Sequence, residues 1–273
     1  MQIKFLTMLS ISLIVATYNW PDALNVCLLS VKQQTVLPSE VIIADDGSDD
    51  ATKALITSMQ KDFPVPLIHV WQADMGFRKS LILNKAIDKA TSTYIVQIDG
   101  DVILDNNFIA DHASVAEKGY FIRGTRAHIS ERFVETVCRE KKTQFNCFSK
   151  ELLHRFNAVR LPSLSFLIQQ KSEKSSGVRG SNLAFRKSDF LDVNGYDNDL
   201  TGWGHEDEEL AARFINNKIR RKSVKFKCIQ FHLYHHQCSY EKKPLHEVAV
   251  NNTRQQNLKS SKNGIANLNL MKS

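Results

Sequence analysis

Short apolar runs alternate with amphipathic stretches through the first hundred residues of the chain. The apolar runs are rich in β-branched residues and end in polar, turn-forming residues, whereas the stretches between them repeat hydrophobic residues at helical spacing. The pattern predicts strands at 11–16, 41–44, 67–70 and 94–98, and helices at 21–34, 51–61 and 79–89. Strands that alternate with helices are typical of βαβ units, so we expect an α/β fold with a mostly parallel sheet.

The N-terminal apolar run has a second interpretation. MQIKFLTMLSISLIVA begins with a lysine followed by apolar residues, which also fits a secretory signal peptide. The run continues into TYN and Trp20-Pro21 without a clean small-residue cleavage site, and it is too short for a transmembrane helix. We therefore interpret it as a buried parallel strand. No other stretch of the sequence is apolar for long enough to cross a bilayer.

The second half of the chain is less regular. Residues 131–156 are basic and amphipathic, which predicts a helix that covers the core and also allows a peripheral membrane contact. Residues 169–180 (QQKSEKSSGVRG) are polar and predict a mobile loop, a candidate lid over a bound donor. Further strands are predicted at 120–124, 182–186 and 225–233, a helix at 206–216, and a polar tail from 239 that folds over the site or is partly disordered.

Composition narrows the classes of protein. A net charge of +7 favours polyanionic partners such as phosphates or an anionic membrane face. No nucleic-acid-binding motif is present, so we expect no nucleic-acid partner. The sequence has five cysteines, an odd number, and no two of them form a C-x-x-C motif. This excludes a zinc ribbon and a disulfide framework. The cysteines fit reduced thiols of a cytosolic protein.

Three polar clusters follow predicted strands: TYN at 17–19, DDGS at 45–48 and DGD at 99–101. Ligands of open α/β sheets bind beyond the carboxyl ends of the strands, so these clusters are expected to converge on one crevice. Asp99 and Asp101 lie two residues apart, and their carboxylates suit Mg²⁺ or Mn²⁺, although a plain Asp-Gly turn has the same sequence. Asp45 and Asp46 can accept hydrogen bonds from a nucleobase or ribose, or can belong to a simple turn.

Two basic residues and two further clusters carry candidate chemistry. Arg78 and Lys79 precede a predicted helix and could contact a diphosphate or be solvated surface charges. HLYHHQ contains His232, His235 and His236. These histidines could bind a metal ion or contact a phosphate, or they could have an ordinary structural role. TGWGHEDEEL at 201–210 concentrates acids at a predicted helix start, where a carboxylate stays ionised and can act as a base.

Taken together, the motifs resemble the family 2 glycosyltransferases with the GT-A fold. TYN, DDGS, DMGFRKSLILNKAI, IDGD and GWGHEDEEL occur in this order across residues 10–240. The resemblance is strongest to the subgroup with a galactosyltransferase-like C-terminal region, which includes bacterial chondroitin-synthesising enzymes. It implies inverting transfer from a nucleotide-diphosphate sugar, usually UDP-linked, with Mn²⁺ or Mg²⁺, to a saccharide or glycolipid acceptor in surface glycan biosynthesis.

The resemblance also implies roles for particular residues. The positions that match the nucleotide-sugar site are Thr17, Tyr18, Asn19, Asp45, Asp46, Asp74, Arg78, Lys79 and Asp99. Those that match the metal site are Asp99, Asp101 and His235, with His232 left as the alternative histidine. Those that match the acceptor site are Trp203, Gly204, His205 and Glu206, with Asp207 as the catalytic base beside Glu206. His205 departs from the common G-W-G-G-E-D pattern, which puts the shape of the acceptor pocket in question.

By the same resemblance, residues 1–110 form a nucleotide-sugar-binding subdomain, 111–240 an acceptor-binding and catalytic subdomain, and 241–273 a tail. We expect a cytoplasmic enzyme that works at the inner face of the membrane. A sugar nucleotidyltransferase is one alternative, but ATYNWPDAL after the first strand lacks the glycine-rich loop that such enzymes need. A phosphatase using a DGD aspartate lacks a supporting threonine or lysine pattern. A non-catalytic carbohydrate-binding subunit is disfavoured by the intact acidic positions.

Overall fold

The computed structural model describes residues 9–236 and 243–268. Within them, eight strands form one large sheet in the order β3-β2-β1-β4-β10-β6-β11-β9. The first four are parallel to one another, and β10 is antiparallel to β4. In chain order these strands are β1 (Ile11–Thr17), β2 (Glu40–Asp45), β3 (Leu67–Trp71), β4 (Tyr94–Asp99), β6 (Tyr120–Arg123), β9 (Gln170–Ser172), β10 (Asn182–Arg186) and β11 (Arg220–Ser223).

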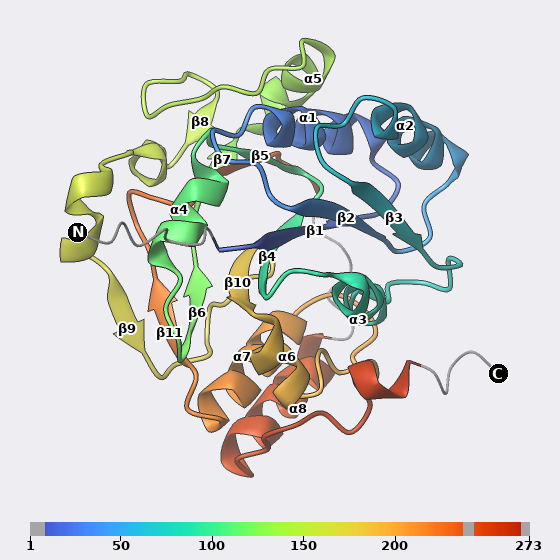
Figure 1. Ribbon diagram of the computed structural model, residues 1–273, viewed down its shortest axis with the longest axis vertical. Coiled ribbons are helices and arrows are strands. Elements are labelled where there is room, and N and C mark those ends of the chain that lie inside the picture. The colour runs from blue at the N-terminus through green and yellow to red at the C-terminus, as the bar shows by residue number, and fades with distance from the viewer. Residues whose placement is uncertain (1–8, 237–242, 269–273) are drawn as a thin grey trace, which may run out of the picture.

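Helices cover both faces of this sheet, as Figure 1 shows. Because side chains alternate along a strand, Leu13 and Val15 pack on one face with α1 and α2, whereas Ile14 and Ala16 pack on the other with α3 and α7. All seven residues of β1 are buried, which explains why its sequence, ISLIVAT, is mainly apolar. The helices are α1 (Pro21–Lys32), α2 (Asp50–Gln60), α3 (Lys79–Lys89), α4 (Phe108–Val115), α5 (Glu131–Arg139), α6 (Lys187–Asp192), α7 (Glu206–Asn216) and α8 (Lys243–Gln255).

A smaller sheet lies beside α1 and brings distant parts of the described chain together. Its four strands run in the order β5-β12-β7-β8, with bounds β5 (Val102–Leu104), β7 (Thr125–Ile129), β8 (Leu152–Leu153) and β12 (Ile229–His232). β5 begins directly after the DGD turn, and β12 pairs with it. This pairing carries the histidines at the end of β12 to the carboxyl end of β4.

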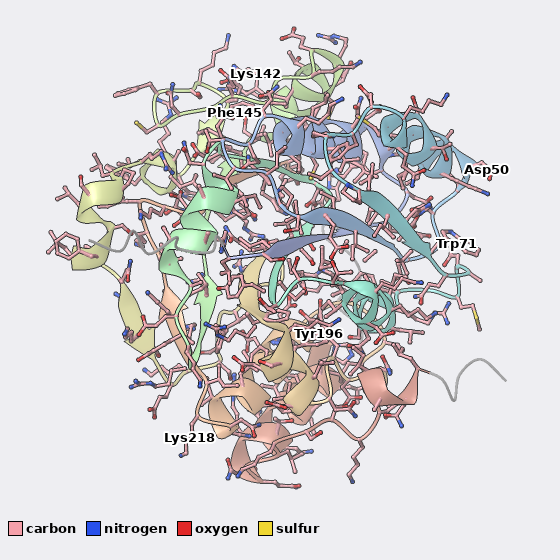
Figure 2. The ribbon with its side chains drawn as sticks, viewed as in Figure 1. Asp50, Trp71, Lys142, Phe145, Tyr196 and Lys218 are labelled. Carbon is pink, nitrogen blue, oxygen red and sulfur yellow. The ribbon has the colours of Figure 1, made fainter. Side chains whose placement is uncertain are left out.

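The alternating strands and helices of the first hundred residues are confirmed, and so is the α/β fold. The helix predicted over 131–156 is wrong beyond Arg139. The chain turns at Lys141, whose φ of 52° is left-handed, and Phe145 packs against Phe231 of the small sheet. Figure 2 shows Lys142 and Phe145 at this end of the molecule.

Two other expected segments differ from the structure. The loop expected over 169–180 begins with the short strand β9, which pairs with β11. The strand expected over 225–233 is shorter, because Phe226 and Cys228 have φ values of 66° and 51° that interrupt an extended backbone. Three short 3-10 helices complete the described elements: Arg155–Ala158, Pro162–Leu167 and Ile265–Asn267.

The described part of the tail folds onto α7. Thr253 of α8 donates to Glu209, and Asn216 donates to the backbone carbonyls of Thr253 and Leu258. Residues 237–242, which include Cys238 and the predicted start of the tail, lie outside the described residues; the described cysteines are free. Among the described residues, no helix is both long enough and apolar enough to cross a bilayer.

Candidate active site

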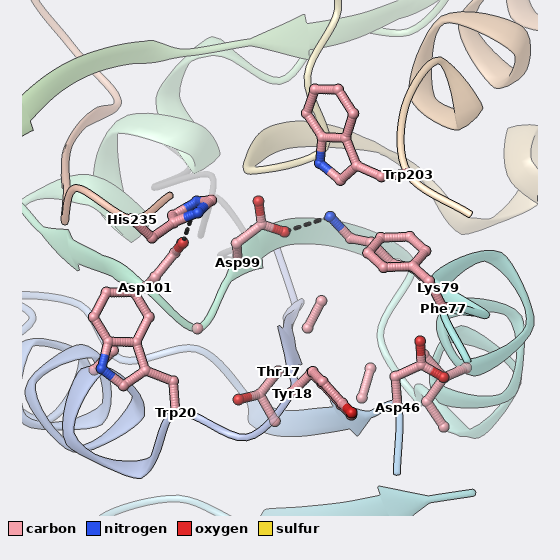
Figure 3. A pocket seen from close by; sticks show the side chains of 15 residues that line it. Thr17, Tyr18, Trp20, Asp46, Phe77, Lys79, Asp99, Asp101, Trp203 and His235 are labelled. Carbon is pink, nitrogen blue, oxygen red and sulfur yellow. Dashed lines mark hydrogen bonds and ion pairs between the residues drawn. The ribbon is translucent and has the colours of Figure 1, made fainter. Parts of the chain in front are cut away.

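A cleft lies at the carboxyl ends of β1 and β4, and the structure brings the three polar clusters of the sequence to it. One cavity of the cleft is lined by Thr17, Tyr18, Asp46, Lys79, Asp99 and Asp101, together with Trp20 and Phe77 (Figure 3). A second cavity shares Lys79, Asp99, Trp203 and His235 with the first and extends to the start of α7. The two cavities therefore form one continuous site with two ends.

Asp46 is held at the wall of the first cavity. Its Oδ1 accepts from Gln72 Nε2 at 2.6 Å, and its Oδ2 accepts from the backbone N–H of Arg78 at 2.7 Å. Burial raises the pKa of Asp46 despite these two hydrogen bonds. Thr17 and Tyr18 line the same cavity, and Tyr18 is 51% exposed, which leaves its ring free to face a ligand.

Asp45 and Asn19 were expected to contact the nucleotide, but their side chains are used to build the turn. Asp45 is fully buried and accepts from the backbone N–H of Ser48 and from His69. Asn19 accepts from the backbone N–H of Asp49, and neither residue lines the two cavities. Both therefore position the DDGS turn next to the end of β1.

Asp74 and Arg78 line neither cavity. Tyr18 donates to Asp74 Oδ2 at 3.0 Å, and Arg78 Nη2 donates to the carbonyl of Ala73. A Cβ at Gly47, whose φ is 97°, would lie 2.6 Å from the backbone of Asp74. Only glycine fits this close approach, which joins the DDGS turn to the DMGFRKS segment.

Lys79 forms an ion pair inside the site rather than lying on the surface. Its Nζ is 2.6 Å from Asp99 Oδ1, as the dashed line in Figure 3 shows. Burial alone would lower the pKa of Lys79, but Asp99, Asp207 and Glu206 raise it well above its usual value. Lys79 is therefore a fixed positive charge between the two ends of the cleft.

Asp101, His232 and His235 form a cluster that can hold a metal ion. Their ligand atoms lie within 4.8 Å of one another, and Asp101 Oδ2 is 3.5 Å from His232 Nε2 and 3.2 Å from His235 Nε2. Asp101 Oδ1 and His232 Nδ1 are buried with no hydrogen-bond partner in the described part of the chain, so the protein alone leaves these two polar atoms unsatisfied. A hydrogen bond to Asp101 raises the pKa of His235 to about 9. Asp99, expected as a metal ligand, lies outside this cluster and pairs with Lys79.

Glu206 and Asp207 open α7 at the other end of the cleft. Asp207 Oδ2 accepts from the backbone N–H of Gly180 at 2.6 Å, and its Oδ1 lies 3.0 Å from the hydroxyl of Tyr196. Burial and the charge of Asp207 raise the pKa of Glu206 to about 7. Burial also raises the pKa of Asp207, against the opposing effects of Lys79 and the Gly180 N–H. The start of α7 favours ionised carboxylates, but burial outweighs this effect and the pKa values of both residues are raised.

His205 occupies the residue before α7 with a φ of 67°. This left-handed conformation is one that glycine adopts without cost, which explains the glycine of the common motif. His205 faces acids on both sides, since Nδ1 lies 3.6 Å from Glu208 and Nε2 lies 3.4 Å from Glu247 of α8. Trp203 and Gly204 line the same cavity, and His246 of α8 holds this loop by hydrogen bonding to the carbonyls of Gly204 and Thr201.

Several residues at the site were not identified from the sequence. Tyr196 lies in the middle of the molecule beside β10 and α6 (Figure 2), where its hydroxyl reaches Asp207 and Gln97. Gly180 is equally hidden, and a Cβ there would lie 2.3 Å from Asp207 Oδ1. Both lie in segments whose sequence carries no motif that marks a functional site. Only their tertiary contacts reveal that they shape the surroundings of Asp207.

Comparison with known proteins defines the class. Residues 12–193 match the family described as "Glycosyl transferase family 2", and residues 168–237 match "N-terminal domain of galactosyltransferase". Because the first match spans more than half of the chain, the chain belongs to glycosyl transferase family 2.

The relatives with known names have low sequence identity to this chain and are longer than it. Validoxylamine A glucosyltransferase of Streptomyces hygroscopicus subsp. limoneus is 26% identical over 220 residues, covering 74% of this chain and 47% of the relative. Chondroitin synthase of Escherichia coli is 21% identical over 253 residues, covering 83% of this chain and 34% of the relative. The chain thus spans about half or a third of the length of these relatives. The crystal structure of GalNAc-T7 with UDP, GalNAc and Mn²⁺ superposes with a TM-score of 0.65 at 14% identity, over 94% of this chain and 56% of that one, which shows the GT-A fold.

Proposed function

We propose that the chain is an inverting, divalent-metal-dependent glycosyltransferase that uses a UDP-sugar donor and acts in surface glycan biosynthesis. The acceptor is a hydroxyl group of a saccharide or a glycolipid. One observation carries the proposal: the Asp101–His232–His235 cluster and the Glu206–Asp207 pair face one cleft, with Lys79 between them.

The donor is assigned to the cavity beside β1 and β2. Asp46 has two oxygens fixed at the cavity wall, and Thr17 and Tyr18 offer a hydroxyl and an aromatic ring next to it. A nucleoside needs such hydrogen-bond acceptors and a stacking surface. Most residues that line this end come from the proposed subdomain 1–110, and most that line the acceptor end come from the proposed subdomain 111–240.

The cluster of one carboxylate and two imidazoles suits Mn²⁺ better than Mg²⁺, which prefers oxygen ligands only. When bound, the ion would stabilise the negative charge that develops on the departing diphosphate. The ammonium group of Lys79 lies next to Asp99 and supplies a further fixed positive charge to this region.

Asp207 is assigned as the general base. The Gly180 N–H holds one of its oxygens, and the Tyr196 hydroxyl lies beside the other, so the carboxylate is fixed in position. Burial and the charge of Asp207 raise the pKa of Glu206, which favours its protonated form and suits hydrogen bonding to the acceptor. Trp203 provides an aromatic surface for the acceptor sugar in the same cavity.

The reaction is a single displacement. The acceptor oxygen forms a bond to the anomeric carbon from the face opposite the diphosphate, and the bond between that carbon and the diphosphate oxygen breaks. The hydroxyl proton passes to Asp207, and the diphosphate leaves with the electron pair of the broken bond. One base suffices for this inverting course.

The test is release of UDP from a panel of UDP-sugars, with and without Mn²⁺. We expect one donor to support metal-dependent release and Asp101→Ala to abolish it. Failure of UDP and of every UDP-sugar to bind in the presence of Mn²⁺ would contradict the proposal.

We also infer peripheral contact with the inner face of the membrane. Residues 148–167 expose apolar side chains next to the basic residues Lys150 and Arg155. The most exposed of these side chains, at 65–91%, are Phe148, Phe156, Phe166 and Leu167. Exposed aromatic groups among basic residues are typical of proteins that insert into the headgroup region of anionic bilayers.

A further inference from the structure

A basic chamber adjoins the acceptor end of the cleft. It lies where the ends of β6 and β11 meet the start of β7 and the residues that precede β10. Its volume is about 290 Å³, far more than the roughly 15 Å³ that one water molecule needs. Four cationic side chains line it and no carboxylate does: Arg123, Arg126, Arg179 and Lys225.

These cations lack acidic partners in the described part of the chain. None of the ion pairs formed by residues 9–236 and 243–268 includes any of the four. Arg126 Nη1 makes a single long hydrogen bond, of 3.4 Å, to the hydroxyl of Ser181. Burial lowers the pKa of Arg123, and the like charges of Arg221 and Arg179 lower it further. Like charges gathered in a partly buried site are unfavourable until an anion neutralises them.

Hydrogen bonds and close packing fix the backbone in the wall of the chamber. Asn182 Nδ2 donates to the carbonyls of Thr125 and Cys228, and Asn182 Oδ1 lies 3.1 Å from His112 Nε2. A Cβ at Gly124 would lie 2.2 Å from Asn182 Oδ1, so glycine is required at this position. Arg123 and Arg126, which flank Gly124 and Thr125, therefore project from a fixed backbone, as a preorganised binding site requires.

The chamber is continuous with the acceptor cavity. Arg126, His128, Arg179 and Ser181 line both. Arg179 directly precedes Gly180, whose N–H donates to Asp207. A saccharide whose hydroxyl group reaches Asp207 can therefore place a neighbouring substituent among the arginines.

We propose that this chamber binds an anionic substituent, a carboxylate or a phosphate, on the acceptor saccharide next to the hydroxyl that is glycosylated. The inference rests on the proposed function and specifies its acceptor class. The planar guanidinium groups of arginine pair with either oxyanion through two parallel hydrogen bonds. A neutral sugar leaves these charges without a counterion.

The experiment is a glycan array probed with the full chain in the presence of UDP and Mn²⁺. The array carries saccharides with uronic acids, their carboxyl-reduced counterparts, phosphorylated saccharides and their dephosphorylated counterparts. We expect the wild type to retain acidic glycans at least tenfold better than the matched neutral ones. Comparing each uronic acid with its carboxyl-reduced counterpart, and each phosphorylated saccharide with its dephosphorylated counterpart, shows which oxyanion the chamber selects.

The test variant is Arg123→Gln combined with Arg179→Gln, and the matched control is Lys174→Gln. The control removes one positive charge from an exposed position of the loop that carries Arg179 and lines neither cavity. The double variant should lose roughly tenfold in acidic-glycan binding for each arginine. Its Tm should not fall, because the substitutions remove like-charge repulsion, and the control should bind as the wild type does.

Two outcomes overturn the inference. Equal retention of acidic and neutral glycans by the wild type is one, and failure of the wild type to retain any acidic glycan is the other. UDP binding with Mn²⁺, measured on the same wild-type sample, separates the two proposals. If UDP binds and either of these two outcomes is seen, only the acceptor inference fails, whereas absence of UDP binding contradicts the proposed function itself.

Discussion

Tyr196→Phe tests how the site keeps Asp207, the proposed base, ionised. The hydroxyl of Tyr196 lies 3.0 Å from Asp207 Oδ1 and 3.0 Å from Gln97 Oε1, and its side chain is fully buried. The substitution removes one oxygen atom and leaves the ring in place. A hydrogen bond to a charged group contributes about 1.5–3 kcal/mol, and the single proton is shared between two acceptors, so we take the lower value.

About 1.5 kcal/mol corresponds to roughly one pKa unit. The bond stabilises the ionised carboxylate, so its loss raises the pKa of Asp207, which is already raised by burial. The base is active when ionised, so activity is lost first at low pH. We expect the acid limb of the profile of kcat against pH to move upward by about one unit. Because Glu206 and Asp207 titrate together, the limb reports the pair.

The assay is UDP release measured across pH, with Tyr94→Phe as the matched control. Tyr94 is also buried, but its hydroxyl has no hydrogen-bond partner within the described residues. The control should keep the wild-type profile. An unchanged acid limb in Tyr196→Phe, with kcat also unchanged, would refute the assignment of Tyr196 as a positioning residue for Asp207.

Three further predictions follow from other parts of the structure. Arg213→Ala removes one partner of a buried ion pair in α7 and should lower the free energy of unfolding by about 3–5 kcal/mol in urea titrations; a loss below about 1 kcal/mol would contradict this. His232→Ala and His235→Ala should each weaken Mn²⁺ binding at least tenfold by calorimetry, whereas unchanged affinity in both would remove the cluster from metal binding. Phe156→Ser combined with Phe166→Ser should reduce flotation with vesicles containing anionic lipid, and equal flotation would argue against the membrane contact.

The sequence predicted the first half of the fold well because its elements follow simple periods. β1 and β4 are mainly apolar because both faces of the sheet are covered, and the helices between the strands repeat their hydrophobic residues at helical spacing. The region after α5 was predicted poorly. Its basic and apolar residues keep an amphipathic pattern beyond Arg139, and the turn at Lys141 depends on packing of the chain that follows.

The candidate site was predicted in outline but not in its connections. Asp101 and Asp207 were singled out as candidates because short motifs place them at a strand end and a helix start. Asp45 looked like a ligand, yet its carboxylate serves the backbone of its own turn. Gly180 and Tyr196 could not be found, because they reach Asp207 from outside its motif, 27 and 11 residues earlier in the chain. Sequence patterns locate the chemistry, whereas tertiary contacts determine which atoms remain available for it.

Asp207→Asn gives the most direct test of the central claim. The change keeps the shape of the side chain and removes its ability to accept the acceptor proton. Binding of UDP with Mn²⁺ should stay within about twofold of the wild type, and transfer should fall by about a hundredfold or more. Retained turnover in Asp207→Asn, with donor binding intact, would contradict the assignment of Asp207 as the base of a single-displacement glycosyltransferase.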